Sequence, residues 1–444
     1  MSLLDAEVVP EIDGLAISDR RAWFALRLRP QVAASESGVR LVLTLDRSSS
    51  MAGHDFTQAR AAARVLVHLL TAEDELALVV FDEQVHVALT PRAMDEAGKA
   101  AATAVLAGLT TGRGTALFDA AKVSLALAGE LRHGHVILIT DGFPFSGITD
   151  LGQLLEMTRT TAGAATLTTI GVGSDLDGAL LCAMAGVAGG RFLHLEEHGD
   201  FVMTLGGELA TVQDAVTGKL ECEVRSAQGF SIATMPHYAP SRAGESGSLR
   251  NAMLAPVVES VEVVMPFELE WDSALGPGEH RAALVTVKVG APGAVATQVL
   301  ELPVRVVVGR ARGAMNGTVT RAVCEIMAGS ALHQAALGED QPVMCVRLLA
   351  DAAGWVRGRA SAAGLDLRGD LAPTLRLLDA TQGLLQAGRA DAPLLHACAE
   401  GVAKRYDASI GSKVSLMEDL RTDGQRKGSL MASRVDSDPG RRRE

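Results

Sequence analysis

Residues 41–53 read LVLTLDRSSSMAG, an apolar run that ends in one carboxylate and a row of hydroxyls. A run without polar alternation is typical of a parallel strand that is buried on both faces. The polar residues Asp46, Ser48 and Ser50 come where this strand is expected to end. Open α/β sheets bind their ligands beyond the carboxyl ends of the strands. The stretch therefore predicts an α/β sheet with a polar site at one rim.

Two later segments are expected to reach the same rim. Residues 135–142 read HVILITDG, a second apolar strand that ends in a carboxylate, Asp141. Residues 110–117 read TTGRGTAL, a glycine-punctuated loop that opens a helix and contains Thr115. Because parallel strands end at the same edge of a sheet, two carboxylates and three hydroxyls are expected to meet there.

The expected donors are all hard oxygen atoms, and neither His nor Cys is among them. Such a set suits Mg²⁺, and Mn²⁺ is also compatible, because both ions favour oxygen ligands and retain several waters. With only two carboxylates from the protein, the ion is expected to stay electrophilic. It would then accept one more carboxylate from a partner molecule.

The three segments resemble the metal-ion-dependent adhesion site (MIDAS) of von Willebrand factor type A (VWA) domains, which combines Asp-x-Ser-x-Ser with a distal Thr and a distal Asp. The corresponding residues here are Asp46, Ser48, Ser50, Thr115 and Asp141. Ser49 stands where the family usually has Gly, which adds a side chain without removing a ligand. The resemblance implies that the serines, and in an open state the threonine, bind the metal directly. It implies that the aspartates act mostly through water.

Length and composition restrict the type of protein. The chain has 444 residues, which suggests two or three domains, and its formal net charge of −12 argues against nucleic acid as the main ligand. Five dispersed cysteines without a Cys-x-x-Cys pair favour reduced thiols over a disulfide framework. The start, MSLLDAE, shows no secretory signal, and no apolar run reaches the roughly 18 residues of a membrane span. A cytoplasmic protein without a membrane span is therefore expected, similar to intracellular multidomain VWA proteins of bacteria.

Hydrophobic patterning divides the chain into five segments. Residues 38–217 alternate apolar strands with helices and predict a Rossmann-like, doubly wound, mostly parallel sheet, the expected VWA domain. Residues 218–309 carry short alternating runs between Gly, Pro and Ser clusters and predict a β-sandwich. Residues 312–425 have helical periodicity with breaks near 338–342, 364–370 and 388–393, and predict a C-terminal helical domain of about four helices. The tail, 426–444, is expected to be disordered.

Residues 1–35 contain Val8-Val9-Pro10 and an alternating segment at 23–29, expected to be half-buried antiparallel strands. In the β-sandwich segment, strands are predicted at 220–224, 257–265, 282–289 and 299–308. These are few for its length, and VWA domains have neighbouring termini, so residues 1–35 are a candidate source of the missing strands. The VWA domain would then be inserted into the sandwich, an arrangement that resembles the integrin β-subunit. The alternative, in which residues 1–35 stand apart, stays open.

The sequence favours an interaction module over an enzyme. It contains neither Gly-x-Ser-x-Gly nor the Gly-x-x-x-x-Gly-Lys-Ser/Thr loop of nucleotide hydrolases. His194 and His198 match a His-x-x-Glu-His zinc motif, but they follow a predicted strand, whose alternate side chains point to opposite faces. The preferred hypothesis is a non-enzymatic module that binds an Asp or Glu of another protein through the MIDAS. Many intracellular VWA proteins resemble partners of MoxR-type or chelatase ATPases, so a non-catalytic AAA+ adaptor is the alternative; a metal-dependent hydrolase ranks last.

Overall fold

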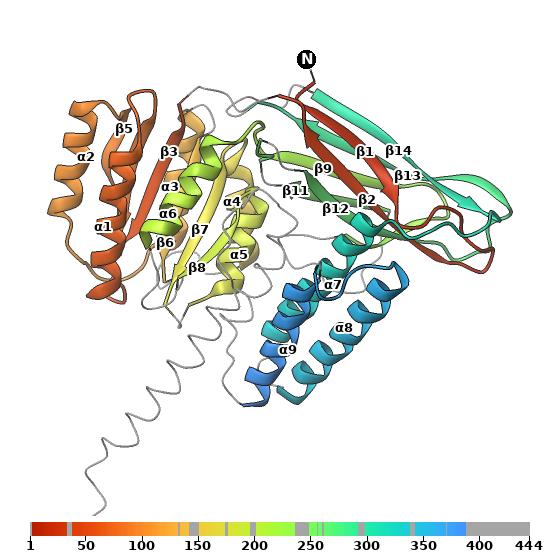
Figure 1. The fold of residues 1–444 in the computed structure, drawn as a ribbon. Helices are drawn as coiled ribbons and strands as arrows, with labels where there is room; N and C mark the ends of the chain where they lie inside the picture. The colour runs from red at the N-terminus through yellow and green to blue at the C-terminus, as the bar shows by residue number, and fades with distance from the viewer. Residues whose placement is uncertain are drawn as a thin grey trace, which may run out of the picture.

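The predicted apolar strand lies in the middle of a six-stranded sheet (Figure 1). The strand order is β5-β4-β3-β6-β7-β8, and all neighbouring pairs are parallel except β4 and β5. These strands are β3 (Arg40–Asp46), β4 (Glu75–Phe81), β5 (Val85–Ala93), β6 (His135–Thr140), β7 (Thr166–Val172) and β8 (Phe192–Leu195). The structure, a computed structural model, describes residues 2–32, 38–131, 134–141, 151–173, 176–195, 201–235, 248–254, 256–259, 262–291, 298–337, 342–369 and 371–387.

Helices cover both faces of this sheet (Figure 1). One face carries α1 (His54–Leu69), α2 (Glu96–Gly108) and α6 (Phe201–Gln213), and the other carries α3 (Leu117–Glu130), α4 (Leu151–Ala162) and α5 (Gly178–Val187). On β3, Leu41 and Leu43 pack in the first layer, whereas Val42 packs in the second. Burial on both faces explains why β3 is mostly apolar between Arg40 and Asp46. The predicted doubly wound α/β sheet is confirmed.

Two four-stranded antiparallel sheets form a second part of the molecule (Figure 1). One sheet has the order β1-β2-β12-β10, and the other has the order β11-β9-β13-β14. Their strands are β1 (Leu4–Pro10), β2 (Arg21–Pro30), β9 (Leu220–Ser226), β10 (Ser231–Thr234), β11 (Leu249–Leu254), β12 (Val263–Glu270), β13 (Gly278–Val289) and β14 (Gln298–Val308). Side chains of both sheets, such as Leu26 and Val285, belong to one buried apolar cluster. The two sheets therefore pack face to face.

The N-terminal strands lie in the first of these sheets. β2 pairs with β12, and Phe24 lies opposite Phe267 in that pair. The sheet thus contains chain segments from before and after the six-stranded sheet. The middle of β2 is buried on both faces, where the alternation predicted a half-buried strand. Leu26 faces the core between the sheets, whereas Ala25 contacts α7 (Gly317–Leu337) on the outside.

The strand positions in this part differ from the predicted ones. β10 and β11 were not predicted, and the strand expected at 257–265 lies at Val263–Glu270. β10 has only four residues, too few for an alternating pattern. β12 contains Pro266, and because proline cannot donate to a strand ladder, its presence argues against a strand that continues past this residue.

Helices α7, α8 (Pro342–Ala362) and α9 (Ala372–Gln386) form the third part (Figure 1). The first two predicted breaks separate them. An ion pair joins this part to the first antiparallel sheet, because the Arg359 guanidinium of α8 donates to Glu11, with Nε 2.9 Å from Oε1. The Thr320 hydroxyl of α7 also donates to Glu11, at 3.1 Å. The rest of the predicted helical segment, from residue 388, and the tail 426–444 lie outside the described residues.

We expect Arg359→Met to lower the free energy of unfolding by about 2–3 kcal/mol, because the almost completely buried Glu11 would lose its cation, while Arg359 itself is 26% exposed. Urea denaturation and amide exchange of α8 measure this effect. Arg357→Met is the matched control, since its ion pair with Asp379 is exposed and contributes little. An equal loss of unfolding free energy in both variants would show that the buried ion pair contributes no more to stability than the exposed one.

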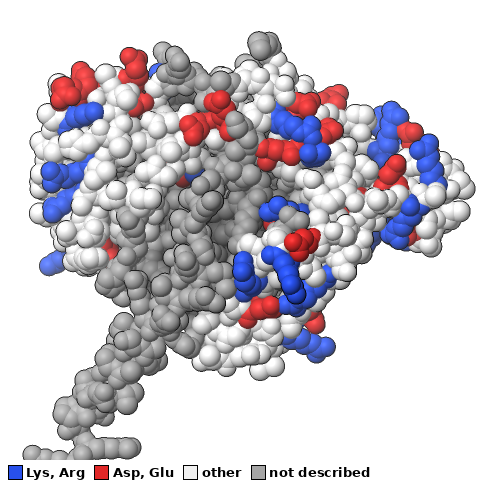
Figure 2. All heavy atoms as spheres, viewed as in Figure 1, with Lys and Arg blue, Asp and Glu red and all other residues white. Residues whose placement is uncertain are grey.

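Two surface properties bear on the type of partner. Across the described part of the chain, no helix has both the length and the apolar character required to cross a membrane. On the face shown in Figure 2, acidic and basic side chains are interspersed over the described surface, and no broad basic patch gathers there. The expectation that nucleic acid is not the main ligand stays a prediction.

Candidate functional site

Asp46 ends the central strand, and its carboxylate is 1% exposed. The hydroxyl of Thr140, at the end of β6, donates to Asp46 Oδ2 at 2.6 Å, so the two strand ends are joined through this carboxylate. The backbone N–H of Ser48 donates to Oδ1 at 2.8 Å. Burial raises the pKa of Asp46 to about 7, although these hydrogen bonds act in the opposite direction. Asp46 is thus a carboxylate whose charge the protein alone leaves poorly compensated.

The two serines lie on the loop that follows Asp46. Ser48 is buried and Ser50 is exposed, and their Oγ atoms are 2.9 Å apart. The Asp46–Ser48 bond is of the aspartate-turn type, in which a carboxylate accepts from the backbone two residues on. This turn holds both hydroxyls beyond the end of β3, as the Asp-x-Ser-x-Ser spacing predicts.

Thr115 lies on the loop before α3, and its side chain is 1% exposed. Its Oγ1 atom is buried and makes no hydrogen bond within the part of the chain that the structure describes. Gly114, just before it, has a φ of 68°, a left-handed conformation that favours glycine. A buried hydroxyl without a partner is costly in a folded protein, so an additional ligand for Oγ1 would be stabilising.

Asp141 follows β6 and is buried. Its negative charge contributes to the raised pKa of Asp46, which places the two carboxylates within electrostatic range of each other. Residues 142–150, directly after it, lie outside the described residues. Two acidic groups at the ends of neighbouring parallel strands β3 and β6 are the arrangement expected from the sequence.

The residues at this rim fit a hard divalent cation. All donors are oxygen atoms, Thr115 Oγ1 has no hydrogen-bond partner among the described residues, and the buried Asp46 and Asp141 repel each other. A cation such as Mg²⁺ or Mn²⁺ would satisfy the hydroxyl and offset the repulsion. Within the described residues, no group of three His, Cys, Asp or Glu side chains could hold a metal, so a site here depends on hydroxyl oxygens.

The sequence reading missed two residues beside the site. Asp82 follows β4 and is buried, and the Arg47 guanidinium lies 2.9 Å from Asp82 Oδ2. A signal was present, since Asp82 ends an apolar run, ELALVVFD, in the same way that Asp46 and Asp141 end theirs. The run is followed closely by a second strand, however, so its carboxylate also fits a turn residue between two paired strands.

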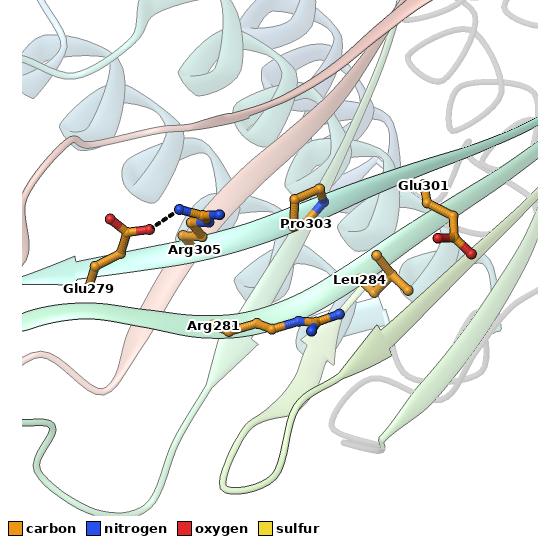
Figure 3. Close-up of a pocket in the computed structure, with 6 residues that line it drawn as sticks. All are labelled: Glu279, Arg281, Leu284, Glu301, Pro303 and Arg305. Atoms are coloured by element: carbon orange, nitrogen blue, oxygen red, sulfur yellow. Dashed lines mark hydrogen bonds and ion pairs between the residues drawn. The ribbon is translucent and has the colours of Figure 1, made fainter.

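Two other features are weaker metal-site candidates. His194 lies on β8, and its Nε2 is 2.7 Å from the Gly173 carbonyl oxygen, whereas His198 is outside the described residues. A depression of about 400 Å³ lies on the exposed face of β13 and β14 (Figure 3). It is lined by Glu279, Arg281, Leu284, Glu301, Pro303 and Arg305. Its two arginines would repel a cation, and it belongs to a different sheet from Asp46.

Comparison with known proteins identifies the six-stranded part. Residues 41–143 match the family described as von Willebrand factor type A domain. The prediction of a VWA domain is therefore confirmed, and VWA domains are a general protein-interaction module. No curated protein matches the sequence.

Solved structures share the fold at low identity. A von Willebrand factor type A protein from Catenulispora acidiphila is 17% identical with a TM-score of 0.66, over 85% of this chain and 89% of that one. The ArnB paralog VWA2 from Sulfolobus acidocaldarius is 15% identical with a TM-score of 0.60, over 91% and 98%. The human COPII-coat protein Sec24c is 13% identical with a TM-score of 0.52, over 82% and 57%. At such identities these likenesses concern the fold alone.

Proposed function

We propose that the rim at Asp46 is a complete MIDAS that holds Mg²⁺, or Mn²⁺, and binds an Asp or Glu of a partner protein. The observation that carries this proposal is the buried Thr115 hydroxyl, which has no hydrogen-bond partner in the part of the chain that the structure describes and lies on the loop beside two buried carboxylates. Burial of an unsatisfied hydroxyl costs about 1–3 kcal/mol. Such a cost is understandable if the hydroxyl is a ligand for a bound ion.

The side chains have separate tasks in this proposal. Ser48, Ser50 and Thr115 supply neutral oxygens, and Asp46 and Asp141 supply negative charge directly or through water. The bound ion would supply the attraction for one further carboxylate. Because the protein contributes only two negative charges, much of the ion's positive charge is left for the partner to neutralise.

The proposed module is non-catalytic. The Ser48 hydroxyl contacts the Ser50 hydroxyl, and neither this contact nor the Asp46 turn provides a base that would activate Ser48 as a nucleophile. Cys222 and Cys324 are buried free thiols, and burial raises the pKa of each to about 12. Such protonated thiols are poor nucleophiles. The proposed location is the cytoplasm, since five dispersed cysteines without a Cys-x-x-Cys pair favour reduced thiols.

Affinity capture from a cell lysate tests the proposal with wild-type protein in Mg²⁺, with wild-type protein in a chelator, and with Asp46→Ala or Thr115→Ala in Mg²⁺. We expect the partners captured in Mg²⁺ to disappear in the other three conditions. Ser49→Ala is the matched control, since it removes an exposed hydroxyl from the same loop and should keep the partners.

Calorimetric titration of chelator-treated protein with Mg²⁺ provides the direct measurement. One bound ion per chain is expected for wild type and for Ser49→Ala. Failure of wild type to bind either Mg²⁺ or Mn²⁺, or capture of the same partners under all conditions, would contradict the proposal. An AAA+ ATPase among the Mg²⁺-dependent partners would assign the adaptor role.

A further inference from the structure

Asp82 is at the centre of the contacts between the strand ends and the Thr115 loop. Its backbone oxygen accepts from the Ala116 N–H at 2.7 Å, which fixes the residue directly after Thr115. Its carboxylate Oδ1 accepts from the Gln84 N–H at 2.9 Å, which closes the turn between β4 and β5. Its Oδ2 is 2.9 Å from the Arg47 guanidinium. One buried carboxylate therefore connects the turn that supports Thr115 to the residue that follows Asp46.

The glycine loop packs directly on this ion pair. The Gly112 N–H donates to the Arg47 backbone oxygen at 2.7 Å. A Cβ atom added at Gly112 would lie only 1.9 Å from Asp82 Oδ2, so glycine is required for the approach. A third bond, from the Glu83 N–H to the Arg113 backbone oxygen at 2.6 Å, ties the middle of the loop to the same turn. The loop thus follows the position of the Arg47–Asp82 pair.

We propose that the Arg47–Asp82 ion pair is a positioning device that holds the Thr115 hydroxyl at the cation site, an inference that rests on the proposed function. Residues 110–116 form neither helix nor strand, so their conformation depends on contacts such as these. Arg47 contacts the loop through its backbone oxygen, which accepts from Gly112. Asp82 contacts it through its backbone oxygen, which accepts from Ala116, and its carboxylate lies against Gly112. The pair therefore joins the residue after Asp46 to the β4–β5 turn that contacts the Thr115 loop.

A purely electrostatic role and a positioning role predict different changes in Mg²⁺ affinity for the two single variants. If only charge mattered, Arg47→Gln would remove a cation near the site and strengthen Mg²⁺ binding, whereas Asp82→Asn would weaken it. If the pair positions the loop, both variants lose the ion pair that joins the β4–β5 turn to the residue after Asp46. Both should then bind Mg²⁺ more weakly, despite their opposite changes in charge.

The experiment compares Arg47→Gln, Asp82→Asn and the double variant with wild type. In chelator-treated protein, amide exchange of residues 110–117 reports loop order without metal, and calorimetry then gives the Mg²⁺ dissociation constant. We expect faster exchange and about 10-fold weaker Mg²⁺ binding in each single variant. The double variant should recover part of both losses, because Gln and Asn can hydrogen-bond without burying a lone charge.

Asp119→Asn is the matched control. It makes the same chemical change as Asp82→Asn, near Thr115, but at an exposed side chain in the first turn of α3. It should leave both measurements close to wild type. Opposite shifts in Mg²⁺ affinity for Arg47→Gln and Asp82→Asn, or unchanged exchange in both, would overturn the positioning role. If wild type bound no divalent cation, the proposed function would fail, while the exchange comparison would still decide whether the pair orders the loop.

Discussion

Replacement of Glu208 by Gln is expected to lower the free energy of unfolding by about 3–5 kcal/mol. Glu208 lies on α6 and is 3% exposed, and it is surrounded by groups that require its charge. Arg191 donates to Oε2 through Nε at 2.9 Å, His135 Nε2 lies 3.0 Å from Oε1, and the Thr168 hydroxyl donates to Oε1 at 2.5 Å. Gln keeps the shape but removes the negative charge that the buried Arg191 guanidinium contacts through two of its nitrogens.

The charge state of Glu208 follows from the same contacts. Burial raises the pKa of Glu208, but Arg191 and His135 overcome this effect and hold the pKa well below its ordinary value. Glu208 therefore stays ionised at neutral pH. The contacts anchor α6 to β6, β7 and the residue before β8, so displacement of α6 along the sheet must break them.

Urea denaturation followed by circular dichroism, with amide exchange of α6, measures the effect of Glu208→Gln. Exchange is informative because a chain of several parts is not expected to unfold in one step. Glu156→Gln is the matched control, since Glu156 forms an exposed ion pair with Arg159 within α4 and should matter little. Wild-type behaviour of Glu208→Gln would show that the buried cluster contributes no net stability.

The metal-free protein is expected to lose stability through Asp46 as the pH rises from about 4 to about 7. Burial raises the pKa of Asp46 from 3.8 to about 7, so in this range the folded protein holds a proton that the unfolded chain releases. Each increase in pH then favours the unfolded chain. The contribution is fully present below pH 3.8, is lost as the pH passes 7, and amounts to roughly 4 kcal/mol.

Comparison with Asp46→Asn isolates this contribution, because an amide does not ionise. In a chelator, we expect Asp46→Asn to be more stable than wild type at pH 8 and to lose the difference near pH 4. Mg²⁺ should reverse the order at pH 8, since it binds the ionised carboxylate of wild type only. Asp119→Asn, at an exposed carboxylate, should follow wild type throughout. Identical pH profiles for wild type and Asp46→Asn would contradict both the raised pKa and its cause.

The candidate site was accessible from the sequence because each of its parts has a local pattern. Asp46 and Asp141 end apolar strands, and Thr115 follows a glycine-rich loop, so the parallel strand order alone predicts one rim for all three. Asp82 also ends an apolar strand, but it lies between β4 and the antiparallel β5, where a carboxylate is typical of a turn. Its contact with Arg47 depends on how the loops meet and has no sequence pattern.

The sequence by itself determined the doubly wound sheet and indicated the polar residues expected at its rim. Burial on both faces requires continuous apolar strands, and the helices between them have a hydrophobic period of about 3.6 residues. Each element can therefore be recognised from a short stretch of sequence. Only the tertiary structure decided that β2 pairs with β12, that Arg359 neutralises Glu11, and that Glu208 anchors α6 to the sheet. These contacts join residues that are far apart in the chain, and many other residues would fit each contact equally well by sequence pattern alone. Selection among them comes from the burial of charge and apolar surface, which exists only once the chain has folded.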